Sequence, residues 1–428
     1  MFFAPRQYQR DAANFAWAHP YSAQLADPGT GKTAIMLAII KHLRATRGSR
    51  VLVVAPMKVA QIVWPAEIRK WDQFSGLTFS ILHGPKKARI ADERTDIHLL
   101  NIEGIPWAAK TKLFARYDTL IVDESSKLKA WTSKRYRALK PWLPGFKRRH
   151  ILTGSPMPLN LLDYFAQQYI VDLGKSLGTA ITHFRNEWFN DVAYKQEYSI
   201  WVPRKGALEH VLSSIKPFAY RLDGEKLLEL PALVFNDIRD DLSNREGYKK
   251  QLAESLAPAG ARQMLARQLT SGYLADGGVF HEQKMTMLSD LVDELQGKPL
   301  LVAFCFRAEG EAIAKRFNCP LIYGGVKTSD SARILEEWNE GKHRVVAVNP
   351  STTGHGLNLQ SGGHHICFFS LTTNQDDYYQ AIRRLRRQGQ KAKTVFVHRL
   401  ILDGTEDDRL IQLLDDKTEA QERFLKGV

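Results

Sequence analysis

Residues Ala26 to Thr33 have the sequence ADPGTGKT, and they run directly into the helical pattern TAIMLAIIKHLRATRG (Thr33 to Gly48). Glycines in such a loop let backbone N–H groups curl around a phosphate, and the start of the following helix adds partial positive charge. Lys32 can then reach the β- and γ-phosphates of a nucleotide, and Thr33 can ligate magnesium. The segment therefore predicts a phosphate loop, whose predicted contact residues are Gly29, Thr30, Gly31, Lys32 and Thr33.

A second acidic motif, IVDESS (Ile121 to Ser126), ends an apolar run. In an enzyme with a phosphate loop, the first acid at such a strand end holds magnesium, which predicts Asp123 as a metal ligand. The next acid, Glu124, is placed to orient and deprotonate the attacking water. A solvated acidic turn would explain this motif if it stood alone. Together with the phosphate loop, it favours nucleotide hydrolysis.

Short apolar runs, each ended by a polar or glycine-rich turn, occur in two groups along the chain. They are residues 51–56, 98–101, 119–125 and 150–156 in the first group, and 299–304, 320–325, 344–350, 364–370 and 393–401 in the second. Continuous apolar runs are typical of strands buried on both faces, as in parallel sheets. Helical patterns separate them, so the sequence predicts an α/β fold with two doubly wound parallel-sheet lobes.

The middle of the chain has few such runs and many aromatic and charged residues at helical spacing, which predicts helical insertions on the lobes. We expect a first lobe over residues 1–230 with an insertion at about 161–230, and a second lobe over 231–428 with an insertion at about 244–296. ELPALVFNDIRDDLS (Glu229 to Ser243) is expected to be extended and to start the second lobe. Trp64, Trp71 and Trp338 fall at amphipathic helical positions and are expected in cores.

The chain is basic: its 428 residues include 60 Lys and Arg against 46 Asp and Glu, for a net charge of +14. Such a surplus favours a polyanionic partner, although a basic protein without one would look the same. The three cysteines form no Cys-x-x-Cys pair, so neither a zinc ribbon nor a disulfide framework is indicated. No uncharged apolar stretch reaches the roughly 20 residues needed to span a bilayer, so no membrane partner is expected.

Three further segments extend the pattern: RQYQRDAANF (Arg6 to Phe15), LTGSPMPLNLLDYF (Leu152 to Phe165) and QAIRRLRRQGQ (Gln380 to Gln390). With the phosphate loop and the acidic motif, they make nearly the whole chain resemble superfamily two helicases, and within them the Swi/Snf-type double-stranded DNA translocases. The resemblance implies two RecA-like lobes. It also implies that Gln9 recognises the adenine of ATP.

Two more segments carry the resemblance. APMKVAQIVWPAEIRKW (Ala55 to Trp71) looks like the family's motif Ia, which lies along one DNA strand, and STTGHGLNLQSGGHHICFFS (Ser351 to Ser370) looks like its motif V. The resemblance implies Gly356 as a further nucleotide contact. The residues that it implies in coupling or in nucleic-acid contact are Thr153, Ser155, Lys58, Thr353 and Gln380.

An arginine cluster such as RRLRR is usually a solvated basic face or a nucleic-acid patch. The family motif implies a sharper role, in which Arg384 and Arg387 reach across to the γ-phosphate. An arginine finger of this kind can raise the rate of phosphoryl transfer by a factor of about 10³–10⁵. Two positions depart from the family pattern: Ser125 and Ser126 follow the acids, and Arg383 stands where the family favours glycine.

The resemblance implies an ATPase that uses ATP and Mg²⁺, is stimulated by nucleic acid, translocates on double-stranded DNA and remodels DNA or protein–DNA complexes. Two alternatives stay open: a strand-separating DNA or RNA helicase, and a non-catalytic nucleic-acid-binding protein with a degenerate ATPase fold. We expect a monomer. We also expect the cytoplasm of a bacterium or of a virus-infected host, because the compact chain resembles bacterial or viral members of the group and lacks a signal peptide.

Overall fold

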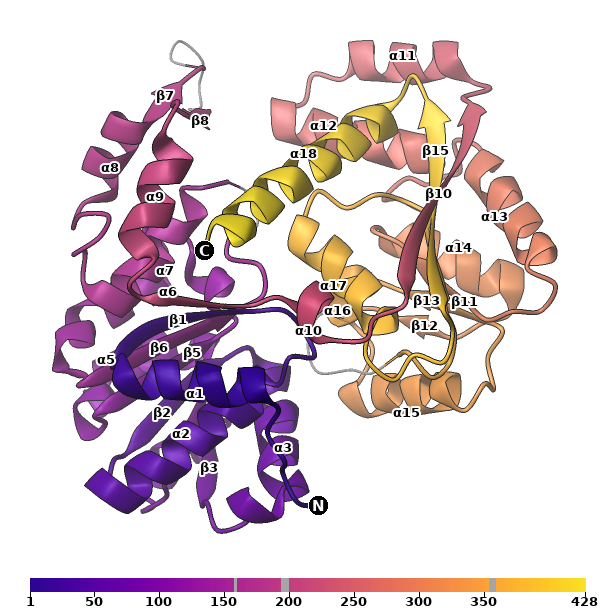
Figure 1. Cartoon of the computed structure of the whole chain (residues 1–428). Helices are drawn as coiled ribbons and strands as arrows, with labels where there is room; N and C mark the ends of the chain where they lie inside the picture. The colour runs from indigo at the N-terminus through magenta and orange to yellow at the C-terminus, as the bar shows by residue number, and fades with distance from the viewer. Residues whose placement is uncertain (158–159, 194–199, 354–358) are drawn as a thin grey trace. The chain divides into compact units, whose positions relative to one another are not determined.

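The computed structural model describes residues 1–157, 160–193, 200–353 and 359–428. By their internal packing the described residues form two units. Unit 1 comprises Met1–Leu228 together with Glu419–Val428, and unit 2 comprises Glu229–Thr418. Each unit is built on a parallel sheet with helices on its faces, which confirms the predicted fold class (Figure 1). The domain boundary near Pro231 stays a prediction.

Unit 1 contains a seven-stranded sheet in the order β3-β4-β2-β5-β6-β1-β9, and every neighbouring pair is parallel. Its strands are β1 (Tyr21–Ala26), β2 (Val51–Ala55), β3 (Phe79–Leu82), β4 (Ile97–Asn101), β5 (Thr119–Asp123), β6 (Arg148–Thr153) and β9 (Ala219–Leu222). In a parallel sheet the carboxyl ends of the strands share one edge, where open α/β sheets bind ligands. The phosphate loop and the acidic motif follow β1 and β5 at that edge.

Alternate residues of the central strands enter two separate cores, one on each face of the sheet. Leu52 and Val54 of β2 belong to the core covered by helices of residues 105–215, whereas Val51 and Val53 belong to the core covered by helices of residues 7–70. All four side chains are at most 1% exposed. This two-sided burial explains why β2 is continuously apolar rather than alternating.

The helices of unit 1 lie on both faces of this sheet and extend away from it (Figure 1). They are α1 (Gln7–Ala18), α2 (Lys32–Arg47), α3 (Trp64–Lys70), α4 (Lys87–Ile90), α5 (Ile105–Lys110), α6 (Lys134–Leu139), α7 (Asp163–Asp172), α8 (Ile181–Trp188), α9 (Ala207–Ile215) and α10 (Gly224–Leu227). A small antiparallel hairpin of β7 (Phe189–Asp191) and β8 (Trp201–Pro203) stands between α8 and α9. The sequence did not predict this hairpin.

Unit 2 contains a six-stranded sheet in the order β10-β15-β14-β11-β13-β12, again with parallel neighbours. Its strands are β10 (Ala232–Asp241), β11 (Leu300–Ala303), β12 (Leu321–Ile322), β13 (Val345–Val348), β14 (His365–Phe368) and β15 (Thr394–Asp403). The predicted extended segment after Pro231 is β10, which pairs with β15 over ten residues.

Helices also cover both faces of the second sheet (Figure 1). They are α11 (Arg245–Glu254), α12 (Ala259–Ser271), α13 (Gln283–Glu294), α14 (Arg307–Phe317), α15 (Thr328–Asn339), α16 (Pro350–Thr353), α17 (Gln375–Leu385) and α18 (Glu406–Gly427), the last of which ends among the unit 1 residues. Within the described residues, no helix is both long and apolar enough to cross a bilayer.

Candidate nucleotide-binding site

The phosphate loop connects the end of β1 to the start of α2, as the sequence predicts. Gly29 and Gly31 have φ angles of 90° and 87°, in the left-handed region that favours glycine. Between them, Thr30 donates its hydroxyl hydrogen to the carbonyl oxygen of Asp27 at 2.7 Å. The backbone conformation therefore favours glycine at both positions, and the loop leads into the amino-terminal end of α2, where helix N–H groups can bind a phosphate.

Lys32, Asp123 and Glu124 come together at the carboxyl edge of the sheet. The Lys32 ammonium donates to Glu124 Oε1 at 2.8 Å and lies 3.6 Å from Asp123 Oδ1. Glu124 has a φ angle of 53°, an uncommon conformation for a residue other than glycine. Residues far apart in the sequence thus form one cluster of a cation and two carboxylates.

Asp123 is almost completely buried, with 1% of its surface exposed. Burial raises the pKa of its carboxyl group, the nearby Lys32 ammonium lowers it, and the Glu124 carboxylate raises it again. Trp64 donates its indole hydrogen to Asp123 Oδ2 at 3.0 Å, and the Glu124 amide donates to Oδ1 at 3.0 Å. A carboxylate held in this way beside a phosphate loop suits a divalent cation, since hard cations prefer oxygen ligands.

Gln9, the predicted adenine contact, lies against the phosphate loop. Its side-chain amide donates to the carbonyl oxygen of Thr30 at 3.1 Å, and its own Oε1 accepts from the Arg6 amide at 3.0 Å. A Cβ atom on Gly31 would lie 2.4 Å from the Gln9 amide nitrogen, so the loop and α1 approach closely. Thr33, the predicted magnesium ligand in the first turn of α2, is buried with 8% exposure.

Two predicted coupling residues lie at the end of β6 and are buried: Thr153 is the last residue of the strand, and Ser155 follows it. Thr153 Oγ1 accepts a hydrogen bond from the Ser155 amide at 3.1 Å. Next to the acidic motif, Ser125 donates to Gln167 on α7 at 2.8 Å, so the segment after Glu124 is fixed to a helix that follows β6. Lys58, in the segment resembling motif Ia, is half-buried, and burial lowers its pKa.

The remaining predicted residues belong to unit 2. Gln380 on α17 donates its side-chain amide to Asp376 Oδ1 at 3.1 Å. Arg384 lies near the end of that helix and Arg387 follows it. Thr353 ends α16. Gly356 lies outside the described residues.

Two family descriptions match the chain in succession. Residues 8–215 match the SNF2-related domain, and residues 283–389 match the helicase conserved C-terminal domain. The chain is a SNF2-related, helicase-like ATPase. The matched ranges contain the phosphate loop and the acidic motif in the first, and Arg384 and Arg387 in the second.

Several curated proteins are similar to this SNF2-related ATPase. It is 28% identical to putative protein p41 of Acyrthosiphon pisum secondary endosymbiont phage 1, over 100% of the chain and 99% of that protein. It is 24% identical to the DNA annealing helicase and endonuclease ZRANB3 of Bos taurus, over 98% of the chain but 40% of that protein. A Sulfolobus solfataricus SWI2/SNF2 ATPase core, solved in complex with double-stranded DNA, matches 99% of the chain and 94% of its own with a TM-score of 0.48 and 18% identity.

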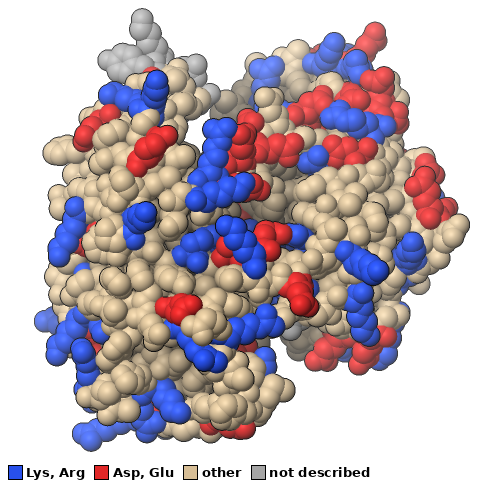
Figure 2. Space-filling model, viewed as in Figure 1, with Lys and Arg blue, Asp and Glu red and all other residues tan. Residues whose placement is uncertain are grey.

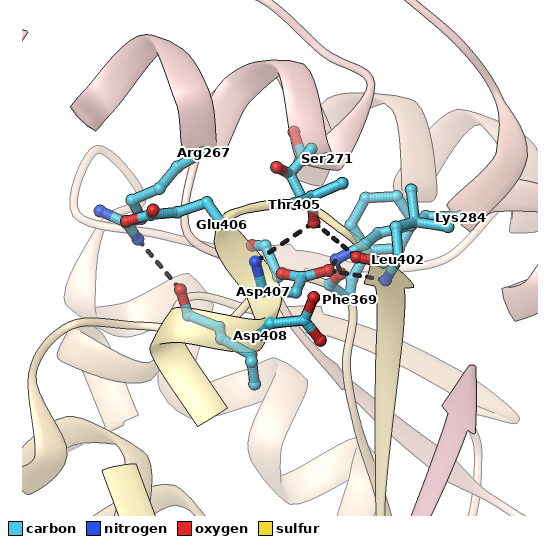
Figure 3. Close-up of polar contacts among 12 residues, drawn as sticks. Arg267, Ser271, Lys284, Phe369, Leu402, Thr405, Glu406, Asp407 and Asp408 are labelled. Carbon is cyan, nitrogen blue, oxygen red and sulfur yellow. Dashed lines mark hydrogen bonds and ion pairs between the residues drawn. The ribbon is translucent and has the colours of Figure 1, made fainter. Parts of the chain in front are cut away.

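The second unit of the SNF2-related ATPase contains a buried ion pair that sequence analysis did not find. Lys284 on α13 is fully buried, and its ammonium lies 2.6 Å from Asp407 Oδ2 and 3.1 Å from the carbonyl oxygen of Phe369 (Figure 3). The Leu402 amide also donates to Asp407, at 3.1 Å. One lysine thereby connects α13 to the residue that follows β14 and to the first turn of α18.

A second buried acid of unit 2 fixes neighbouring strand ends. Glu309 Oε2 accepts from the amides of Cys305 and Phe306 at 3.0 and 3.1 Å, and from the Ser370 hydroxyl at 2.6 Å. Burial raises the pKa of its carboxyl group, and these hydrogen bonds lower it. The contacts hold the segments that follow β11 and β14 in one arrangement.

Sequence analysis also missed a residue in the candidate site itself. Trp64 is fully buried, as its helical position predicts, but its indole N–H contacts Asp123. No local pattern distinguishes a core tryptophan from one that contacts a carboxylate 59 residues away. That contact depends on the packing of α3 beside β5.

Proposed function

We propose that this SNF2-related ATPase translocates on double-stranded DNA, using ATP bound with Mg²⁺ at the site described above. The observation that supports this most is the cluster of Lys32, Asp123 and Glu124 beside a phosphate loop with two left-handed glycines. Lys32 is assigned to the β- and γ-phosphates, while Thr33 and Asp123 are assigned to the metal ion. The ion would neutralise charge that develops on the phosphates.

Glu124 is proposed as the group that orients the attacking water and accepts its proton. In the structure Lys32 donates a hydrogen bond to Glu124. The Glu124 carboxylate therefore occupies the contact that Lys32 would make with phosphate oxygens of a bound nucleotide. When a nucleotide binds, Lys32 can exchange its carboxylate contact for a phosphate contact. Glu124 then becomes available as a base.

Unit 2 is proposed to contribute Arg384 and Arg387, whose guanidinium groups would offset charge at the γ-phosphate. Arg386, between them, donates through Nε to the carbonyl oxygen of Pro231 at 2.9 Å. This contact joins the arginine segment to the start of unit 2. It would keep the segment after α17 fixed while its two arginines contact the nucleotide.

The distribution of charge supports binding of the polyanion mainly by unit 1. Unit 1 holds 36 of the 60 Lys and Arg residues but only 21 of the 46 Asp and Glu residues, so it carries the net positive charge of the whole chain. Between Glu124 and Asp163 the sequence has nine basic residues and no acidic one, and seven of the nine are at least partly exposed. On the face of unit 1 that Figure 2 shows, Lys and Arg side chains outnumber Asp and Glu side chains. Such a surface favours phosphate contacts that do not depend on base sequence.

The relatives support the nucleic-acid assignment and a setting in a bacterium or its virus. ZRANB3 is named a DNA annealing helicase and endonuclease, and p41 is a phage protein of nearly the same extent as this chain. We propose that the chain acts as a monomer on DNA or on protein–DNA complexes. A strand-separating DNA or RNA helicase is the alternative of the same class.

Displacement of the third strand from a DNA triplex tests the proposed function. With ATP and Mg²⁺, the protein should displace the third strand while leaving the strands of a forked duplex paired, because translocation on a duplex needs no strand separation. Failure to displace the triplex would overturn the proposal. Unwinding of the fork would favour the strand-separating alternative instead.

A further inference from the structure

Asp27, at the start of the phosphate loop, forms hydrogen bonds with the segment that immediately precedes unit 2 in the sequence. Asp27 Oδ2 accepts from the Arg221 guanidinium at 2.6 Å and from the Gly224 amide at 2.9 Å. Arg221 lies on β9, and Gly224 is the first residue of α10. The proposed bond-cleavage chemistry does not use any of these three residues.

The contact is reinforced by the backbone and is largely removed from water. The Asp27 amide donates to the carbonyl oxygen of Leu222 at 3.1 Å, and Arg221 donates through a second nitrogen to the carbonyl oxygen of Leu25 at 3.0 Å. The side chains of Arg221 and Asp27 are only 16% and 12% exposed. Charge-assisted hydrogen bonds in such surroundings are among the stronger contacts in proteins.

On the loop side, Asp27 is fixed to the residue at the centre of the phosphate loop. Its carbonyl oxygen accepts from the Thr30 hydroxyl at 2.7 Å and from the Thr30 amide at 3.3 Å. Thr30 stands between the two left-handed glycines. A change in the loop when phosphate binds would therefore be passed to Asp27.

On the other side, Asp27 contacts the last elements before the chain enters unit 2. A Cβ atom on Gly224 would lie 3.0 Å from the Asp27 Cβ, so the start of α10 lies directly against the aspartate. The helix ends at Leu227, and unit 2 begins at Glu229. Only one residue, Leu228, separates the end of α10 from unit 2.

We propose that Asp27 is a positioning residue that transmits the nucleotide state of the phosphate loop, through Arg221 and Gly224, to the connection between the two units. This inference rests on the proposed ATP-driven translocation, because translocation requires hydrolysis to be coupled to movement of one unit relative to the other. The bound nucleotide stabilises one arrangement of the loop. Because Asp27 contacts both the loop and α10, that loop arrangement also stabilises one arrangement of the connection between the two units.

Hydrogen exchange on the full chain tests the inference without requiring DNA. Exchange is measured with and without ADP and Mg²⁺, at equal saturation, for wild type, Asp27→Asn and Gly224→Ala. Asp27→Asn keeps the size of the side chain and removes its charge, whereas Gly224→Ala keeps both charges and crowds the contact. The matched control is Asp96→Asn, because Asp96 also receives an arginine (Arg44, 3.0 Å) and a backbone amide, but near the other end of α2.

Couplings between sites commonly amount to about 5–150-fold, so the nucleotide should slow exchange of residues 222–228 by at least about fivefold in wild type and in Asp96→Asn. In Asp27→Asn and Gly224→Ala this change should fall below about twofold, while protection of residues 28–33 by the nucleotide persists. The inference is overturned if residues 222–228 of wild type do not respond to the nucleotide. It is equally overturned if both contact variants respond as wild type does.

Triplex displacement separates this inference from the proposed function. If wild type shows the exchange response but displaces no triplex, the proposed translocation fails and the transmission through Asp27 stands. If wild type displaces the triplex, Asp27→Asn should displace fewer third strands per ATP hydrolysed, with its KM for ATP within about twofold of wild type. A purely structural role would instead reduce hydrolysis and displacement together.

Discussion

At the scale of single residues, the proposed hydrolysis depends on Glu124, which forms an ion pair with Lys32 in the structure. Replacing Glu124 by Gln keeps the shape of the side chain but removes the proton acceptor. General-base catalysis usually contributes about 10²–10⁴-fold, so kcat for ATP should fall by that factor while the affinity for ATP stays close to wild type. Phosphate release and binding of a fluorescent ATP analogue measure the two quantities.

The matched control is Glu103→Gln. Glu103 forms an ion pair with Arg135 and is 62% exposed, so its replacement should leave kcat unchanged. Wild-type turnover by Glu124→Gln would show that another group accepts the proton. A similar loss in both variants would point to a general effect of charge.

A second residue-scale prediction concerns His150, which is buried on β6 and contacts the Ser22 hydroxyl at 2.8 Å. Burial, together with the neighbouring Arg148 and Arg149 guanidinium groups, lowers its pKa to about 3. The unfolded chain would bind a proton below pH 6.5, whereas the folded chain would not. The free energy of unfolding should therefore fall as the pH drops below 6.5, and His150 should contribute a loss of about 2 kcal/mol at pH 5.

Urea unfolding of wild type and His150→Asn at pH 7.5 and pH 5 tests this prediction. The variant should lose less stability than wild type between the two pH values, whatever its stability at pH 7.5. An equal loss in the two proteins would mean that His150 is already protonated in the folded chain or does not titrate in the unfolded one.

At the scale of elements, most of the strands that sequence analysis predicted are buried on both faces, and β10, predicted as an extended segment, is the mostly exposed exception. β2 and β5 are continuously apolar and were predicted from that pattern. β9 has the sequence AYRL and was not predicted, because Arg221 interrupts the apolar run and is accommodated by its contact with Asp27. The hairpin of β7 and β8 was missed because its strands have three residues each, too few for a periodic pattern.

The buried Lys284 gives an element-scale prediction, because it connects α13 to the residue that follows β14 and to the first turn of α18. Replacing Lys284 by Met leaves Asp407 buried without its cation, and breaking a buried ion pair in this way typically costs about 3–5 kcal/mol. Lys250→Met is the control, since Lys250 is 72% exposed and lies 4.0 Å from Glu254. It should change stability by less than about 0.5 kcal/mol. Denaturant unfolding measures both, and a loss below about 1 kcal/mol for Lys284→Met would show that Asp407 is satisfied in another way.

At the scale of the whole molecule, the composition favoured a polyanionic partner without excluding a basic protein that has none, and it did not show which part of the chain carries the positive charge. The net charge of +14 is a property of the sequence, whereas its concentration in unit 1 appears only when the chain is divided by its packing. The same limit applies to the site. Local motifs predicted Lys32, Asp123 and Glu124 as site residues, but the contacts of Trp64 and Arg221 depend on packing between distant segments.

The charge distribution predicts different effects of neutralising lysines and arginines in the two units. The double variant Lys134→Gln/Arg137→Gln removes two exposed charges from α6 in unit 1, and Lys249→Gln/Lys250→Gln removes two exposed charges from α11 in unit 2. Each lost phosphate contact should lower the slope of log affinity against log salt by about one. The unit 1 variant should therefore lower the slope for duplex DNA by up to about two, and the unit 2 variant should leave it unchanged. A larger effect of the unit 2 variant would contradict binding mainly by unit 1.

The rate of ATP hydrolysis by the whole protein, measured without nucleic acid and with duplex DNA, single-stranded DNA or RNA, tests the central claim most directly. The Mg²⁺-dependent rate should rise most with duplex DNA, and Lys32→Ala should abolish it in every case while the protein stays folded. A rate that duplex DNA leaves unchanged, or a Lys32→Ala variant that hydrolyses ATP as wild type does, would contradict a DNA-driven motor built on this phosphate loop.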